Sequence, residues 1–119
     1  MNGSVLVVDD DPAFRRLARR LLPALGLAWA GEASSAASAL AAAASLQPDG
    51  VLVDVGLPDG DGVTLAGELA ALPFAPRVVL TSSDAEAADA SDVERAGAAA
   101  FVPKDQLPNA ALDSLLRRA

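Results

Sequence analysis

The stretch VLVVDDDP, residues 5–12, decides the fold class. Its first half is a short, unbroken run of aliphatic residues, which is typical of a strand that is covered on both faces. Its second half is three aspartates followed by a proline. Asp11 is a good helix N-cap, and Pro12 suits the first helical position, where no N–H is needed. The stretch therefore predicts a buried strand that leads directly into a helix.

The same alternation continues along the chain. Apolar residues at helical spacing follow Pro12 and stop at Gly26, a typical helix end, while the arginines at 15, 16, 19 and 20 form what we interpret as a solvated face. We expect strands at 5–8, 27–30, 51–54, 78–81 and 99–102, and helices at 12–25, 35–46, 63–72, 85–96 and 107–118. Five such units predict an α/β fold, a doubly wound five-stranded parallel sheet flanked by five helices, in one domain over residues 1–119.

Composition excludes several classes of function. The chain has neither Cys nor His, so disulfides, thiolate or imidazole metal sites and Ser-His hydrolases are excluded. Its net charge of −7 and aromatic content of 3% argue against direct nucleic-acid binding by this domain. No apolar run approaches the roughly 20 residues of a membrane span, and the N-terminus lacks the basic segment of a secretory signal. We expect a cytoplasmic domain with no membrane partner.

Polar residues gather where the predicted strands end. Asp9 and Asp10 follow the first strand, Asp54 ends the third, Thr81 ends the fourth, and Lys104, the single lysine, follows the fifth. Ligands of open parallel sheets bind beyond the carboxyl ends of the strands. Clustered carboxylates suit Mg²⁺, and a hydroxyl and an ammonium group beside them could bind phosphoryl oxygens. This arrangement favours phosphoryl transfer to a carboxylate.

Each of these residues also has a simpler interpretation. Thr81 and Lys104 are ordinary residues by themselves, and only their joint placement at the strand ends singles them out. Asp59 and Asp61 lie in a Gly-rich loop over 56–62, where aspartates are more often turn or cap residues than ligands.

Four segments together resemble the receiver domain of bacterial two-component response regulators. They are VVDDDP at 7–12, VDVGLPDGDG at 53–62, LTSS at 80–83 and GAAAFVPK at 97–104. The resemblance covers essentially the whole chain. It implies that Asp54 accepts the phosphoryl group and that Mg²⁺ is bound by Asp9, Asp10, Asp54 and the backbone carbonyl of Gly56.

The resemblance also implies roles for residues around the acceptor. Thr81 and Lys104 would contact phosphoryl oxygens. Phe101 matches the family's aromatic switch position, which turns inward as the threonine moves; the alternative is a static, partly buried aromatic. Gly56 and Ser83 stand at two positions that influence how fast the phosphoryl group is lost. The chain departs from the family at the residue after the lysine: the family often has proline there, and here Asp105 follows.

The implied function is a phosphorylation-dependent switch rather than an enzyme. Because the chain has no His, the phosphoryl donor must be a separate sensor histidine kinase or phosphotransfer protein. The output partner, or a C-terminal output domain that could bind DNA, is not identified by these residues. One alternative is a Mg²⁺-dependent aspartyl-nucleophile phosphatase, which usually carries a second Asp where this chain has Gly56. The other is a receiver-like interaction module that is never phosphorylated, but such a module would lack an acidic, acceptor or lysine residue, and none is missing.

Overall fold

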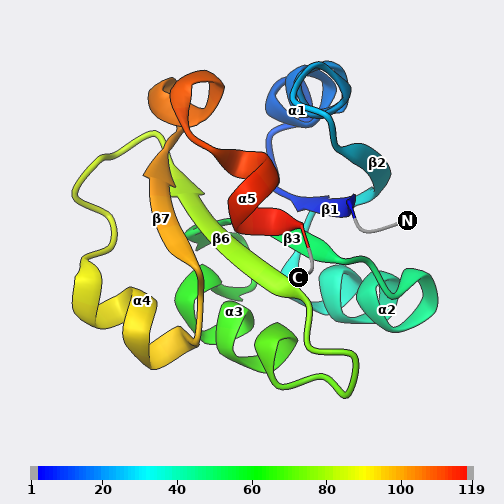
Figure 1. Cartoon of the computed structure of the whole chain (residues 1–119). Helices are drawn as coiled ribbons and strands as arrows, with labels where there is room; N and C mark the ends of the chain where they lie inside the picture. Colours follow the sequence, from blue (N-terminus) through cyan, green and yellow to red (C-terminus); the bar gives the residue numbers. More distant parts are fainter. Residues whose placement is uncertain (1–2, 118–119) are drawn as a thin grey trace.

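Five parallel strands form the centre of the molecule. The computed structural model describes residues 3–117, and its sheet has the order β2-β1-β3-β6-β7. The strands are β1 (Ser4–Val8), β2 (Ala28–Ala33), β3 (Gly50–Asp54), β6 (Arg77–Ser82) and β7 (Ala100–Pro103). The chain winds outward from β1 in both directions, so the strand order reverses between β1 and β3 (Figure 1). The predicted doubly wound parallel sheet is confirmed.

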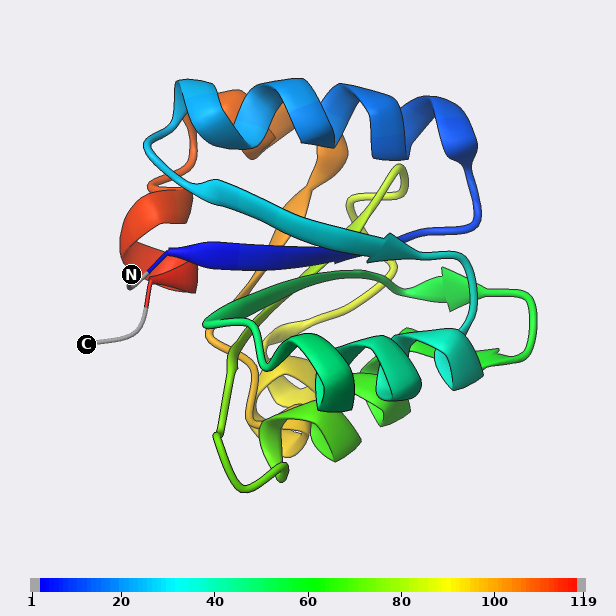
Figure 2. The ribbon, with the colours of Figure 1, turned by 90° about the vertical axis from the view of Figure 1, so that its right-hand side faces the viewer.

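Helices cover both faces of this sheet. They are α1 (Pro12–Ala24), α2 (Ala36–Leu46), α3 (Gly62–Ala70), α4 (Ala90–Ala96), the 3-10 helix η1 (Lys104–Asn109) and α5 (Leu112–Leu116). Helices α1 and α5 and η1 pack on one face, and α2, α3 and α4 pack on the other (Figures 1 and 2). Within residues 3–117, no helix is long and apolar enough to cross a membrane.

Strand β1 forms where the sequence predicts it because its side chains alternate between two apolar cores. Val5 and Val7 of β1 pack against α1 and α5, whereas Leu6 and Val8 pack against the helices of the opposite face. All four side chains are buried. Burial of such a side chain contributes about 1.5–3 kcal/mol to folding. A strand without polar positions is stable here because water reaches neither face.

Local capping fixes how α1 leaves the sheet. The Asp11 side chain accepts a hydrogen bond from the backbone N–H of Ala13 at 2.9 Å, and Pro12 occupies the first turn. The helix ends before Gly26, whose φ of +82° is readily adopted by glycine. The predicted cap and stop are therefore confirmed.

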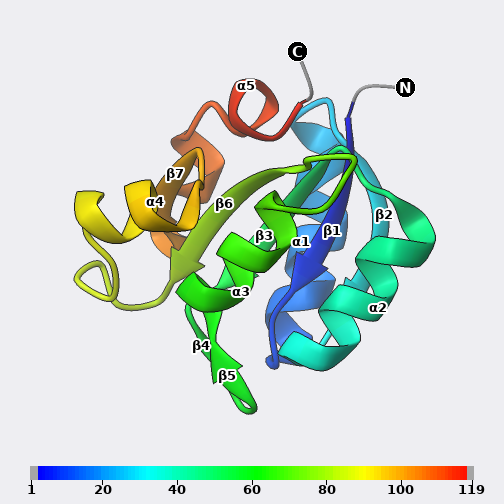
Figure 3. The ribbon, with the colours of Figure 1, turned by 90° about the horizontal axis from the view of Figure 1, so that it is seen from below.

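The loop at 56–62 is more ordered than expected. Strands β4 (Gly56–Leu57) and β5 (Gly60–Asp61) form a small antiparallel hairpin at the end of β3 (Figure 3). Asp61 caps α3, and Asp59 accepts hydrogen bonds from the N–H groups of Ala36 at 2.7 Å and Ala37 at 3.1 Å. These two hydrogen bonds hold the pKa of Asp59 below its usual value. The interpretation of Asp59 and Asp61 as cap residues is confirmed.

Three predicted segments differ from the structure. Strand β2 runs to Ala33 because it continues to pair with β1 as far as Val8. Helix α4 begins at Ala90 rather than near 85, because Asp89 and Asp92 form a capping box there. The predicted helix at 107–118 is wrong over its first half: the chain forms η1 and then the short α5, and residue 118 lies outside the described residues. Pro108 lies inside η1, and the α-helix begins only after it, at Leu112.

Candidate functional site

The predicted site residues come together at the carboxyl ends of three neighbouring strands. Asp9 directly follows β1, Asp54 is the last residue of β3, and Thr81 lies opposite Asp54 in the register of β3 and β6. The edge between β1 and β3 is where the strand order reverses. In open α/β sheets this crevice is the usual ligand site.

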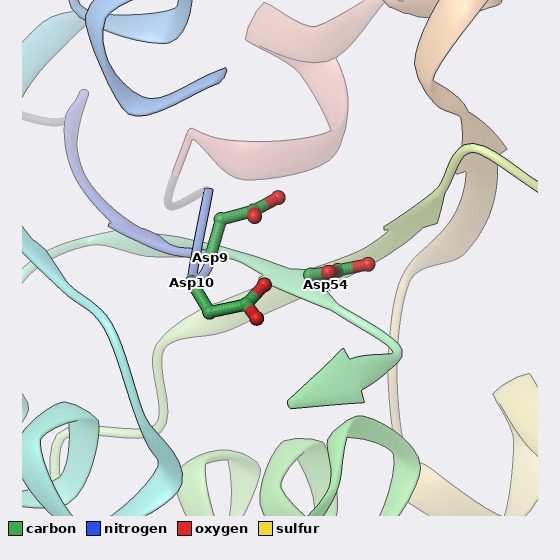
Figure 4. A group of neighbouring side chains, drawn as sticks. All are labelled: Asp9, Asp10 and Asp54. Atoms are coloured by element: carbon green, nitrogen blue, oxygen red, sulfur yellow. The ribbon is translucent and has the colours of Figure 1, made fainter. Parts of the chain in front are cut away.

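Three carboxylates form the core of this site. One oxygen each from Asp9, Asp10 and Asp54 lies within 4.8 Å of the others. Figure 4 shows these side chains extending to the same side from the ends of β1 and β3. Asp9 is fully buried, Asp54 is 8% exposed, and Asp10 is exposed. The cluster therefore has an interior wall and an open side.

The donor atoms of this cluster fit a hard divalent cation. All three are carboxylate oxygens, which Mg²⁺ prefers, and the exposed side leaves room for the waters that Mg²⁺ retains. The Oδ2 atom of Asp9 is buried, and among the described residues its cationic neighbour is the Lys104 ammonium. A buried carboxylate oxygen needs a cationic partner, since burying it unpaired is costly.

Asp9 is held in place by its backbone and its side chain. Its N–H donates to the carbonyl of Ala33 at 3.0 Å, and its Oδ1 accepts from the N–H of Asp11 at 2.9 Å. Its Oδ2 forms an ion pair with Lys104 Nζ at 2.7 Å. The side chain of Lys104 is 18% exposed, and its ammonium also lies 4.2 Å from the centroid of the Phe14 ring. The one lysine of the chain is thus part of the acidic site.

The surroundings of Asp54 disfavour its charged form. Burial is the largest cause that raises the pKa of Asp54, and the neighbouring charges of Asp9 and Asp10 add to it. Lys104 and a hydrogen bond with the backbone of Gly56 act in the opposite direction. A cation bound among the three carboxylates would relieve this repulsion.

Thr81 belongs to the site by position, but its hydroxyl points to β7. The residue is fully buried, and Oγ1 donates a hydrogen bond to the carbonyl of Val102 at 2.7 Å. Phe101, the residue before Val102, is half-buried and pairs with Leu80 in the register of β6 and β7. A hydrogen bond therefore joins Thr81 to the β7 residue that follows Phe101.

The two remaining predicted residues follow the ends of β3 and β6. Gly56 and Ser83 are exposed, at the start of β4 and just after β6. A Cβ atom placed on Gly56 would meet nothing within 4 Å. The position of Gly56, two residues after Asp54, is therefore open to solvent.

Sequence reasoning missed two residues of the site, Phe14 and Arg15. One terminal nitrogen of Arg15 donates to the backbone carbonyl of Asp9 at 2.7 Å, and its Nε pairs with Glu32 at 2.5 Å. The interpretation of a fully solvated arginine face is therefore wrong for Arg15. Helical side chains lean toward the helix N-terminus, so residues in the first turn after the Asp11 cap reach back to the strand ends. Their position in the first turn of α1 is the sequence feature that could have identified both residues.

Comparison with known proteins places this geometry in a family. The profile of the response regulator receiver domain matches residues 5–116. The chain is 40% identical over 100 residues to the transcriptional regulatory protein KdpE of Mycobacterium tuberculosis, covering 84% of this chain and 43% of that protein. It is 26% identical over 115 residues to the chemotaxis protein CheY of Thermotoga maritima, covering 97% of this chain and 96% of that one.

The fold comparison agrees. The structure superposes on the crystal structure of a LuxR-family two-component response regulator from an Aurantimonas species with a TM-score of 0.84 and 26% identity. That match covers 100% of this chain and 90% of the other. The chain spans between 31% and 49% of the length of several curated relatives, among them a protein-glutamate methylesterase/protein-glutamine glutaminase of Hahella chejuensis.

Proposed function

Because this chain belongs to the response regulator receiver domain family, we propose that it is a cytoplasmic switch that takes a phosphoryl group on Asp54. The observation that carries this proposal is the gathering of Asp9, Asp10 and Asp54, with carboxylate oxygens within 4.8 Å, at the edge where the strand order reverses. Residues 1–119 serve as one receiver domain in this proposal. Its partners are a sensor histidine kinase or phosphotransfer protein and an output partner or output domain, which could bind DNA as the name of the KdpE relative suggests.

Mg²⁺ is the cofactor of the proposed reaction. Asp9, Asp10, Asp54 and the backbone carbonyl of Gly56 would hold it, with Asp10 on the solvent side. When bound, the cation offsets the charge of the carboxylates and of the incoming phosphoryl oxygens. This role fits the donor set, because the three carboxylate oxygens lie within 4.8 Å of one another.

Asp54 is the nucleophile of the proposed transfer. One of its carboxylate oxygens forms a bond to phosphorus as the bond between phosphorus and the donor's imidazole nitrogen breaks. The electron pair of the broken bond stays on that nitrogen, which then takes a proton. The chain's own Lys104, now paired with Asp9, turns toward a phosphoryl oxygen and neutralises part of its charge.

Thr81 and Phe101 convert the new charge into a change of surface. For its hydroxyl to reach a phosphoryl oxygen, Thr81 must give up its hydrogen bond to Val102. This loss frees the β7 backbone beside Phe101, which can then turn inward. Two arrangements of the β6–β7 edge, biased by the phosphoryl group, constitute the switch. Gly56 and Ser83, being small and exposed, let water reach the phosphoryl group and limit its lifetime.

The test is intact-mass spectrometry after incubation with Mg²⁺ and acetyl phosphate. We expect the wild-type chain to gain the mass of one phosphoryl group, and Asp54→Ala or the wild type in excess EDTA to gain none. A wild type that gains no mass from acetyl phosphate or from a phosphorylated histidine donor would support the interaction-module alternative. Continuous phosphate release from unrelated phosphate esters would support the phosphatase alternative.

A further inference from the structure

The ammonium of Lys104 has two neighbours of different chemistry. It lies 2.7 Å from Asp9 Oδ2 and 4.2 Å from the centroid of the Phe14 ring. A carboxylate binds an ammonium through charge and hydrogen bonds, whereas the face of an aromatic ring attracts it through the ring quadrupole. Lys104 is therefore held from two sides, one of which is apolar.

The backbone of Lys104 does little to fix this side chain. Lys104 is the first residue of η1, and Asp105, which does not restrict the backbone as proline does, follows it. A lysine side chain is a flexible four-carbon stem, so its ammonium needs partners to keep one position. The position of Nζ in this chain is set by what surrounds it.

Phe14, in contrast, is a rigid platform. It is 8% exposed and lies in the first turn of α1, after the Asp11 cap and Pro12. Its ring packs into the core that α1 shares with β1, β3, β6 and β7. One face of this fixed ring meets Lys104 at the border of the acidic site.

The two neighbours differ in what they leave free. An ammonium has three N–H donors, and an attraction to a ring face does not require a directed hydrogen bond to an oxygen. When a phosphoryl group arrives, Lys104 can exchange Asp9 for a phosphoryl oxygen while it stays over the ring. Phe14 can therefore restrain the ammonium without competing for the donors that the reaction needs.

We propose that Phe14 is a positioning residue for phosphoryl transfer, whose ring face holds the Lys104 ammonium beside the acidic cluster. This inference rests on the proposed function and adds a residue to it. Phe14 acts through Lys104 and touches no reacting atom.

The kinetic test compares variants in the rate of phosphorylation by acetyl phosphate at saturating Mg²⁺. Phe14→Leu keeps an apolar core residue and removes the ring, so we expect a rate about threefold to tenfold lower. Phe14→Tyr keeps the ring and should stay near the wild-type rate. Phe74→Leu is the matched control, because it removes a partly buried ring on the other face of the sheet. In a Lys104→Met background, Phe14→Leu should cause no further loss.

The second readout does not depend on reactivity. Because Lys104 is the single lysine, ¹³C-lysine labelling gives one set of side-chain signals by NMR. Its ε-CH₂ protons should resonate upfield in the wild type because of the ring current, and should return to ordinary values in Phe14→Leu but not in Phe74→Leu. Nuclear Overhauser contacts between these protons and the Phe14 ring should be present in the wild type.

The outcomes separate this inference from the proposed function. If the wild type is phosphorylated and Phe14→Leu reacts equally fast, Phe14 has no positioning role and the proposed function stands. The same conclusion follows if Phe14→Leu lowers the rate by the same factor in the Lys104→Met background as in the wild type. Ordinary ε-CH₂ shifts in the wild type would also overturn the inference, even if Phe14→Tyr failed to fold. If the wild type takes no phosphoryl group, the proposed function itself is overturned, and the inference with it.

Discussion

The Thr81 hydroxyl donates a 2.7 Å hydrogen bond to the carbonyl of Val102, inside the protein and one residue from Phe101. This bond connects the end of β6 to β7 at the point where Thr81 lies opposite Asp54. The threonine hydroxyl has one hydrogen to donate, so it cannot donate to the Val102 carbonyl and to a phosphoryl oxygen on Asp54 at the same time. The choice between these two acceptors is the basis of the switch we propose.

Replacing the threonine should first be visible in stability. Thr81→Ala removes a buried donor and leaves the Val102 carbonyl without this partner, so we expect the free energy of unfolding to fall by about 1–3 kcal/mol. Thr81→Ser keeps the hydroxyl and should lose less. Urea denaturation of the three proteins checks this. Equal losses for Ala and Ser would show that packing of the methyl group, rather than the hydrogen bond, is what matters.

Gly62 should be intolerant of any side chain. A Cβ atom there would lie 2.6 Å from Val55 Cα and still closer to the carbonyl oxygen of Asp54, and neither backbone atom can move freely. We expect Gly62→Ala to lower the free energy of unfolding by about 1–3 kcal/mol and to slow phosphorylation by displacing Asp54.

Gly60→Ala is the matched control for this substitution. It lies in the same hairpin, and its Cβ would meet only the Cβ of Ala36, at 3.7 Å. We expect its stability to stay within about 0.5 kcal/mol of the wild type. A Gly62→Ala protein that is as stable and as reactive as Gly60→Ala would contradict the tight packing of α3 against the end of β3.

The raised pKa of Asp54 predicts how stability depends on pH without metal. The fold favours the protonated carboxyl, so the contribution of Asp54 is most favourable below the unfolded value of 3.8 and is lost as pH rises through the folded pKa. In EDTA at pH 7, Asp54→Asn should therefore be more stable than the wild type, and the difference should shrink as pH falls toward 3.8.

Metal should act in the opposite sense in the same measurement. A cation that binds only the folded state raises its stability, and Mg²⁺ should do so more for the wild type than for Asp54→Asn. Asp113→Asn, a substitution of an exposed aspartate of α5, is the control and should follow the wild type. A wild type that is equally stable with Mg²⁺ and with EDTA would argue against the metal site.

The open space at Gly56 predicts a longer-lived phosphorylated state when it is filled. Because a side chain added there meets no atom within 4 Å of its Cβ, Gly56→Met should fold normally. Its side chain should cover part of the approach to Asp54 and slow hydrolysis severalfold. Loss of phosphorylated protein after removal of acetyl phosphate, followed by intact mass, measures this. An unchanged lifetime would show that water reaches the phosphoryl group by another route.

The parts of the fold that could be predicted are those fixed by local chemistry. The run at 5–8 and the Asp11 cap define β1 and the start of α1, since neither depends on distant residues. The start of α4 could not be predicted, because Asp84 and Asp89 are both suitable helix caps and the sequence does not decide between them. Asp84 accepts a hydrogen bond from the N–H of Glu86 at 2.9 Å and forms a local turn, while Asp89 gains a reciprocal cap with Asp92.

The site residues also fall into two groups, those that a local pattern locates and those that long-range packing brings together. The strand ends locate Asp9, Asp54 and Thr81 on one edge of the sheet, because parallel strands place their carboxyl ends together. The contacts of Lys104 with Asp9 and Phe14 join residues some 90 positions apart in the sequence. They depend on side-chain packing between α1 and the end of β7, which no local pattern records.

The most direct test of the account is to locate the phosphoryl group. Wild-type protein is phosphorylated with acetyl phosphate and Mg²⁺, reduced with borohydride, which converts an aspartyl phosphate to homoserine, and sequenced by peptide mass spectrometry. We predict homoserine at position 54 alone, and none in a sample kept in EDTA. Homoserine at position 9 or 10, or an unmodified position 54 in a protein that carries a phosphoryl group elsewhere, would contradict the assignment of Asp54 as the acceptor.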